Sequence, residues 1–299
     1  MKDIAASVLS RLLNISKENK EDYQSLLIRF IAERFLSRLG KSSYRDEFIL
    51  KGAYLLTLTL ENMNYRSTKD IDFLKTGATD IDFLIKAFIE ICSIEDKSDG
   101  VIFDSDTITL RENREQNTYN GQRVKIIAYI GKTRTTLQID IGIGDSVYPA
   151  PCSIEIPSLL DLDTASISSY HIYTVIAEKL EAIISLSLIT SRMKDFYDIY
   201  IIISNLKLEY AALKESISRT FHNRGTTIPT QLPLVLSTTV INDKTKQMQW
   251  KAFLSNIRQE QTDLDFEKVV KLISDFFSVF LNSQNANIYT SWSADKGWS

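Results

Sequence analysis

The middle of the chain, between about residues 101 and 156, alternates apolar with polar residues. Successive side chains of a strand point to opposite faces, so this period of two predicts several antiparallel strands. Asn120-Gly121 and Gly131-Lys132 have the composition of turns between such strands. The apolar members of the pattern are Ile102, Ile108, Leu110, Val124, Ile126, Ala128, Leu137, Ile139, Ile141 and Ile143.

Helical periodicity lies on both sides of this region. Residues 20–39 and 48–60 carry apolar side chains at helical spacing, and Thr79-Asp80 is expected to cap a third helix. The sequence Asp-Ile-Asp-Phe-Leu occurs at 70–74, where we expect a strand, and again at 80–84, where we expect this third helix to start. Later helices are expected over 171–188, 193–205, 209–222, 244–257 and 265–282, followed by a frayed polar tail.

This order of elements predicts an α+β fold, with a mixed sheet in an amino-terminal domain and a helical carboxyl-terminal domain. The 299 residues, of which 44% are hydrophobic, suffice for two cores. We expect the domains to span residues 1–165 and 166–299.

Charge and cysteine content narrow the class of protein. The net charge of −3 excludes a chain that coats nucleic acid over its whole surface, so any such contact requires a local basic patch. Cys92 and Cys152 lie far apart in apolar surroundings, and we expect buried free thiols in a reducing compartment. The amino terminus lacks the apolar core of a signal peptide, and no apolar run is long enough for a membrane span. We therefore expect a cytoplasmic protein.

Asp70-Ile71-Asp72 is the sharpest local motif. Residues i and i+2 of a strand share a face, so the two carboxylates project side by side. At about 4 Å and an effective dielectric of 20 they repel by ~4 kcal/mol, which a bound cation would offset. Closely spaced oxygen ligands suit Mg²⁺ or Mn²⁺. Taken alone, the motif is more often a solvated turn than a metal site.

Asp140 strengthens the metal interpretation because it lies within the apolar strand sequence Leu137–Ile143. An unpaired charge is costly in a central strand. If this strand neighbours the first, three carboxylates converge as in a two-metal phosphoryl-transfer site. Asp145 follows two glycines and is better explained as a turn residue.

Two segments are candidates for holding phosphate. Lys51-Gly52-Ala53 opens a predicted helix, and free amides at a helix start favour anions. Gly52 could equally be a packing glycine. Ser67-Thr68-Lys69 adds hydroxyls and a cation beside the acid pair, although its composition also fits an ordinary polar loop.

Lys179 lies in a predicted amphipathic helix and could contact a phosphate or pair with a nearby glutamate. Asp195 and Asp198 lie about one helical turn apart, in a segment that also carries Arg192 and Lys194. These two acids either position Lys179 through ion pairs or tie two helices together. His171 and His222 are isolated, which does not support a Ser-His-Asp hydrolase.

Taken in order, these segments resemble the AbiEii/AbiGii toxin family of nucleotidyltransferases over residues 45–205. The stretches that carry the resemblance are 51–53, 66–73, 119–123, 137–145, 178–182 and 191–198.

The resemblance implies a polymerase-β-like nucleotidyltransferase domain that acts as a toxin in toxin–antitoxin and abortive-infection systems, the latter a phage defence. It implies Asp70 and Asp72 as metal ligands, Asp140 as a third strand acid and metal ligand, Lys179 as the triphosphate lysine, and Asp195 or Asp198 as an essential acid. It further implies NTP as substrate, Mg²⁺ or Mn²⁺ as cofactor, an RNA acceptor such as a tRNA 3′ end, and a cognate antitoxin. We also place Gly52, Ala53, Ser67, Thr68, Lys69, Arg192 and Lys194 among the candidate nucleotide-binding residues.

One position departs from the wider fold family, which usually has Gly-Ser or Gly-Gly where this chain has Gly52-Ala53. Two other functions stay open on the same residues, namely nucleotidylylation of a protein and NTP binding without turnover. A possible basic rim for the RNA backbone comprises Arg111, Arg114, Arg123, Lys125, Lys132 and Arg134.

Overall fold

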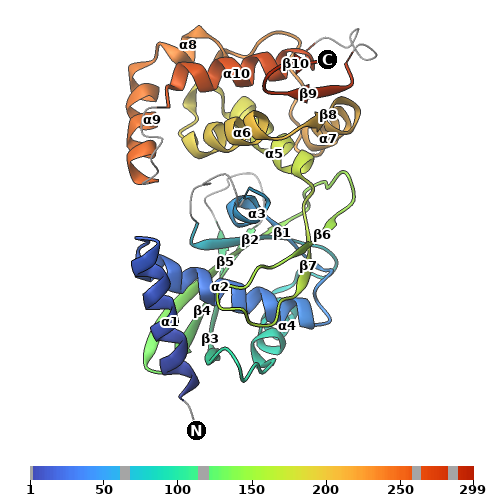
Figure 1. Cartoon of the computed structure of the whole chain (residues 1–299). Coiled ribbons are helices and arrows are strands. Elements are labelled where there is room, and N and C mark those ends of the chain that lie inside the picture. The colour runs from blue at the N-terminus through green and yellow to red at the C-terminus, as the bar shows by residue number, and fades with distance from the viewer. Residues whose placement is uncertain (1–2, 61–67, 114–120, 258–263, 282–288) are drawn as a thin grey trace. The chain divides into compact units, whose positions relative to one another are not determined.

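The computed structural model describes residues 3–60, 68–113, 121–257, 264–281 and 289–299 (Figure 1). The chain divides into two compact units. Of the described residues, unit 1 comprises those within 3–144 and 151–170, and unit 2 comprises those within 145–150 and 171–299.

Unit 1 is built on a mixed sheet with the strand order β3-β4-β5-β2-β1-β7-β6. β2 pairs with β5 in parallel, as does β1 with β7, and the remaining pairs are antiparallel. This mixed sheet confirms the predicted α+β class. Its strands are β1 (Phe48–Lys51), β2 (Asp70–Lys75), β3 (Val101–Asn113), β4 (Gly121–Ile130), β5 (Thr133–Ile143), β6 (Cys152–Glu155) and β7 (Ser166–Ser169).

The helices of unit 1 supply the apolar layer that buries one face of this sheet. Phe35 of α2 stacks on Phe88 of α4 and meets the edge of Phe103 of β3, with ring centroids 5.7 and 5.8 Å apart. Asp80 caps α4 by accepting a hydrogen bond from the Phe83 amide at 2.8 Å, as predicted. The helices are α1 (Ile4–Glu18), α2 (Tyr23–Lys41), α3 (Gly52–Thr59) and α4 (Ile81–Ser93).

β4 and β5 show the predicted alternation directly. Val124, Ile126, Ala128 and Ile130 are buried, and so are Thr135, Leu137, Ile139 and Ile141. The residues between them are half-buried or exposed. The sheet therefore has one face in the core and one that carries polar side chains, including the three predicted acids.

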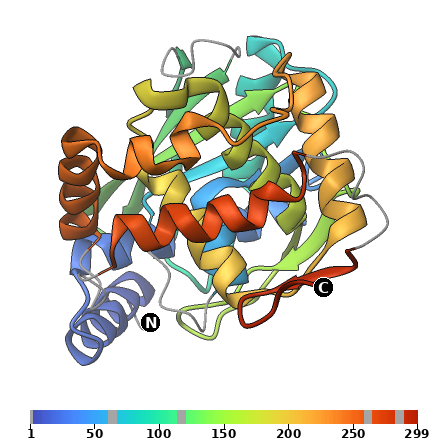
Figure 2. The same ribbon diagram turned by 90° about the horizontal axis from the view of Figure 1, so that it is seen from above.

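Unit 2 is mainly helical, and α10 packs against α6 at its centre (Figure 2). A small sheet with the order β10-β9-β8 borders these helices. The elements are α5 (Ile172–Leu186), η2 (Ser187–Ile189), α6 (Met193–Asn205), β8 (Leu208–Glu209), α7 (Tyr210–Asn223), η3 (Leu234–Leu236), α8 (Thr238–Ile241), α9 (Lys244–Asn256), α10 (Phe266–Ser278), β9 (Ser291–Ser293) and β10 (Gly297–Trp298).

Two predictions of secondary structure were wrong. Residues 48–51 form the strand β1 and not the start of a helix, because Phe48, Ile49 and Leu50 pair with β2 inside the core. The end of the chain, from residue 289, is not frayed. Trp292 is 3% exposed and donates from Nε1 to the Ile203 carbonyl at 2.7 Å, which fixes β9 on α6.

The prediction of buried free thiols is confirmed for one of the two cysteines and wrong for the other. Cys92 is buried in α4, and burial raises its thiol pKa to about 12. Cys152 is exposed, because β6 is an edge strand with little covering it.

Candidate active site

A row of charged residues crosses one face of the sheet in unit 1. The strand registers align Lys51 of β1 with Asp72 of β2, and Asp72 with Asp140 of β5. Asp140 in turn aligns with Arg123 of β4. Residues that are register partners project to the same face, so two carboxylates lie side by side with a cation on each flank.

Asp70 occupies the same face one step along β2, since residues i and i+2 of a strand point the same way. Its register partner on β5 is Gln138. Ile71 and Phe73 alternate with the two acids and are buried on the opposite face. Asp70, Asp72 and Asp140 therefore share one face, and β2 and β5 are neighbours, both as predicted from the sequence.

Arg123 holds Asp140 in a two-pronged ion pair. Its Nε donates to Oδ1 at 2.7 Å, and its Nη2 donates to Oδ2 at 3.0 Å. Such fork-shaped pairing fixes both carboxylate oxygens. It also offsets part of the repulsion between Asp140 and Asp72, roughly 3 kcal/mol at 5 Å and an effective dielectric of 20.

Gly52 at the start of α3 packs directly on the carboxylate of Asp72. Its φ is +71°, and a Cβ built there would lie 2.6 Å from Asp72 Cγ, well inside van der Waals contact. Both facts require glycine. The side chain of Lys51, the residue at the N-cap position, does not cap the amino end of α3. A helix start without a side-chain cap, beside the acid pair, is a place where an anion binds favourably.

The donor set of this face fits a hard divalent cation. Carboxylate oxygens are the ligands that Mg²⁺ and Mn²⁺ prefer. Among the described residues, no three His, Cys, Asp or Glu side chains form a group that could hold a metal. Mg²⁺ commonly uses one or two carboxylates and completes its shell with substrate phosphates and water, so Asp70 and Asp72 suffice as the protein's share.

In unit 2, Lys179 of α5 is fixed by two acids of α6. Its Nζ donates to Asp195 Oδ1 at 2.9 Å and to Asp198 Oδ2 at 2.7 Å. Both carboxylates are at most 1% exposed, whereas the lysine side chain is 12% exposed. Of the alternatives left open by the sequence, pairing of Lys179 with an exposed glutamate is excluded. The ion pairs both position Lys179 and connect the two helices.

Arg192 and Lys194 differ in their surroundings. Arg192 Nε lies 2.5 Å from Asp195 Oδ2, and Lys194 is exposed. Burial raises the pKa of Asp195, but the nearby charges of Lys179 and Arg192 outweigh it and hold that pKa below its usual value. Asp195 is therefore an ionised, buried carboxylate.

A second buried charge cluster in unit 2, centred on Arg224, was not predicted from the sequence. Its Nη2 lies 2.9 Å from Asp145 Oδ1, and its Nη1 lies 2.9 Å from Glu181 Oε2. Glu178 lies 3.4 Å from Nη2. These acids raise the pKa of Arg224 against the opposing effect of burial. Asp145, expected as a turn residue, follows the bend at Gly144 and also anchors this cluster.

Several residues of the predicted motifs lie outside the described residues. They are Arg66 and Ser67, which precede β2, and Arg114, Tyr119 and Asn120, which lie between β3 and β4 in the sequence. Thr68 is half-buried, with its Oγ1 3.5 Å from the Asp70 carbonyl, and Lys69 is exposed. Ala53 follows Gly52 in the first turn of α3.

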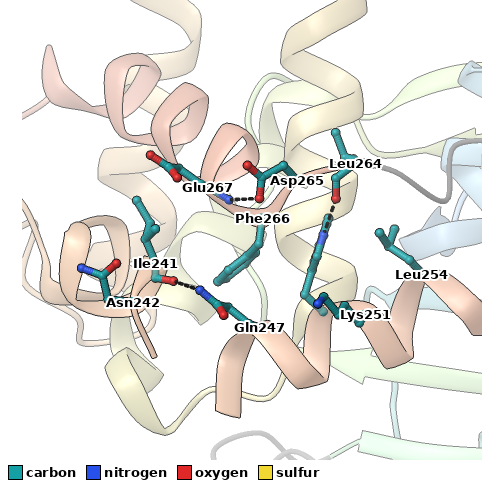
Figure 3. Close-up of a pocket in the computed structure, with 10 residues that line it drawn as sticks. Ile241, Asn242, Gln247, Lys251, Leu254, Leu264, Asp265, Phe266 and Glu267 are labelled. Carbon is teal, nitrogen blue, oxygen red and sulfur yellow. Dashed lines mark hydrogen bonds between the residues drawn. The ribbon is translucent and has the colours of Figure 1, made fainter. Parts of the chain in front are cut away.

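A pocket of about 410 Å³ lies in unit 2, lined by residues of α8, α9 and α10, and none of its lining residues is a predicted site residue (Figure 3). The buried rings of Trp250 and Phe266 are part of its wall, and Lys251 and Glu267 are exposed at it. Trp250 Nε1 donates to the Leu264 carbonyl at 2.7 Å, so its polar atom is already satisfied.

Residues 34–272 match a known family model, described as the nucleotidyl transferase AbiEii toxin of a type IV toxin–antitoxin system. The chain belongs to the AbiEii family. It is therefore a nucleotidyltransferase of a toxin–antitoxin family, as the resemblance implied. No curated protein matches the chain in sequence.

Two solved structures from Helicobacter pylori are similar to this AbiEii chain. The protein JHP933 shares 14% sequence identity over 89% of this chain and 97% of its own, with a TM-score of 0.49. A candidate nucleotidyltransferase shares 13% identity over 89% and 96%, with a TM-score of 0.47. Within the described residues, no helix is both long and apolar enough to cross a bilayer.

Proposed function

We propose that this AbiEii protein transfers a nucleoside monophosphate from an NTP to a hydroxyl of an RNA acceptor, with a tRNA 3′ end as the first candidate. The contact of Gly52 with Asp72 is the observation that carries the proposal, because it brings a helix start suited to phosphate against the acid pair suited to a cation.

In the proposal, Asp70 and Asp72 hold Mg²⁺ or Mn²⁺ together with the phosphates of the NTP. The bound ion supplies neutralisation of the negative charge on the phosphates. Lys51, the register partner of Asp72, is half-buried on the same face, and its Nζ lies 3.4 Å from the Tyr170 hydroxyl. Lys51 and the first amides of α3 then bind phosphate oxygens on the protein's side.

The transfer itself forms one bond and breaks one. The acceptor hydroxyl oxygen attacks the α-phosphorus, the bond from this phosphorus to the bridging oxygen breaks, and pyrophosphate leaves. The hydroxyl proton passes to a carboxylate oxygen of Asp140, which Arg123 holds in orientation. Asp140 would also serve as a metal ligand through one carboxylate oxygen, while the hydrogen bond from Arg123 to the other oxygen keeps the carboxylate oriented.

Lys179 is further proposed as a cation that binds the triphosphate, as the resemblance to the family implies. Asp195 and Asp198 act as positioning residues, since both bind its Nζ. Arg192 and Lys194 are proposed as additional nucleotide contacts. Replacing Lys179 with Arg keeps the charge but changes its shape, so the KM for NTP should rise while the fold is kept.

The test is label transfer. The protein is incubated with each α-³²P-labelled NTP, Mg²⁺ and total RNA from a bacterium, and the products are separated into RNA and protein. Label in RNA, lost in the Asp70→Asn and Asp72→Asn variants, supports the proposal. Label in protein supports the alternative of protein nucleotidylylation. NTP binding without label in either fraction supports an inactive binding module.

A further inference from the structure

The polar face of β3, β4 and β5 is open beside the acid pair. On β4 the residues between the buried ones are Arg123, Lys125, Ile127 and Tyr129, and on β5 they are Arg134, Thr136, Gln138 and Asp140. All eight are half-buried or exposed. Side chains on the opposite face fill the core, so this face is the one available to a partner.

Three cations on this open face stand without an acidic partner. Arg111, Lys125 and Arg134 are exposed, and no described acid forms an ion pair with any of them. Arg123, by contrast, is engaged by Asp140. The described acids on this face are Asp140 and Asp104, the register partner of Ile127. Three cations outside any ion pair, in a chain of net charge −3, still form a local patch suited to a polyanion.

The registers place these cations along a path that ends at the acids. Arg111 is the partner of Arg123, which is the partner of Asp140. Lys125 is the partner of Gln138, which is the partner of Asp70. With strands about 4.8 Å apart, Arg111 and Lys125 each lie roughly 10 Å from an acid, and Arg134 lies roughly 20 Å from Asp140 along β5.

An aromatic ring lies on the same face at the far end of this path. Tyr129 is half-buried, and its register partners are Arg134 on β5 and Ile102 on β3. Aromatic rings beside cations are the usual platform for unpaired bases, because bases stack on the ring while the cations hold the backbone. A duplex offers no exposed base faces, so this combination favours a single strand.

We propose that the open face of β3, β4 and β5 binds the single-stranded end of the acceptor RNA and leads its terminal hydroxyl to Asp70 and Asp72. Arg111, Lys125 and Arg134 bind phosphates, and Tyr129 stacks on a base. This inference rests on the proposed transfer to RNA. It goes further by assigning the surface on which the acceptor lies and by requiring that the end of the acceptor is unpaired.

The test measures binding alone, with the full chain and no NTP. The probe is a fluorescein-labelled ten-nucleotide RNA of mixed, non-pairing sequence, and anisotropy gives Kd at several salt concentrations. The variant Arg111→Gln/Lys125→Gln/Arg134→Gln is compared with a control, Lys17→Gln/Lys20→Gln/Lys97→Gln. The control removes three exposed lysines of unit 1 that lie on other surfaces, so both variants change the net charge equally.

The open-face variant should bind about tenfold more weakly than wild type, and the slope of log K against log salt should fall by about 2, as expected for three lost single-strand phosphate contacts. Tyr129→Leu should weaken binding with no change of slope. Equal binding by the open-face variant and wild type, an equal loss in the control, or no RNA binding by wild type would overturn the inference. Intact binding with no label transfer would refute the proposed function and leave standing only the binding of a single strand on the open face.

Discussion

Arg123 binds both carboxylate oxygens of Asp140, with Nε 2.7 Å from Oδ1 and Nη2 3.0 Å from Oδ2. The two residues face each other across the β4–β5 hairpin. Asp140 is also the strand neighbour of Asp72. Asp140 therefore lies between an arginine on one neighbouring strand and the acid pair on the other.

Arg123→Gln is expected to strengthen Mn²⁺ binding several-fold in the absence of NTP, because the cation no longer competes with a guanidinium for Asp140. Electron paramagnetic resonance of free Mn²⁺ measures the affinity. Adding Asp140→Asn to the same chain should remove the gain. Unchanged Mn²⁺ affinity in Arg123→Gln would show that Asp140 is not a metal ligand.

Gly52→Ala should abolish most nucleotidyl transfer, with a loss of at least about tenfold, because its Cβ would displace the Asp72 carboxylate. The substitution also forces alanine into a positive φ, which costs about 1–3 kcal/mol. Gly225→Ala is the matched control, since its φ is +66° and nothing lies within 4 Å of the added Cβ. Equal activity in the two variants would mean that contact with Asp72 is unimportant.

Asp195→Asn should lower the free energy of unfolding by about 3 kcal/mol at pH 7, because a buried ion pair is broken. The folded pKa of Asp195 is depressed, so its contribution is present above the unfolded pKa near 3.9 and is lost as pH falls further. Urea unfolding at pH 7 and pH 3 should show the gap between wild type and variant narrowing at pH 3. A gap of constant size would contradict an ionised Asp195.

Trp292→Ala should destabilise unit 2 by about 3–5 kcal/mol, since a nearly fully buried indole is removed and the Ile203 carbonyl loses its donor. Trp298 is half-buried and bonds to the Phe276 carbonyl at 2.8 Å. Trp298→Ala should therefore cost clearly less. The fall in melting temperature of each variant measures its destabilisation. Equal falls for the two variants would contradict the stronger anchoring of Trp292.

The hairpin that carries the site was largely predictable from sequence. The period of two across β4 and β5 assigned their buried faces, and the Gly131-Lys132 turn lies where it was expected. Counting outward from this two-residue turn also pairs Arg123 with Asp140, so the ion pair could have been found by register alone.

β1 and its role in the site could not be found in this way. Residues 48–60 form one apolar run in which a four-residue strand passes directly into α3, and only Gly52 marks the change. The alignment of Lys51 with Asp72 depends on that strand. In the second cluster, Arg224 binds Asp145 and Glu181, which lie 79 and 43 positions before it in the sequence. Local sequence patterns do not predict contacts over such separations. The last two strands, β9 and β10, are three and two residues long, and tryptophan side chains pack them on the helices. The polar composition of the segment around them gave no sign of these strands.

The most direct test of the central claim is transfer of α-³²P label from NTP to RNA by wild type and by Asp72→Asn, at equal protein concentration and with Mg²⁺ present. Asparagine keeps the shape beside Gly52 but removes the negative charge that holds a cation. The account predicts labelled RNA with wild type and at least a hundredfold less with the variant, about 2.7 kcal/mol of transition-state stabilisation. Equal labelling by the two proteins would contradict it.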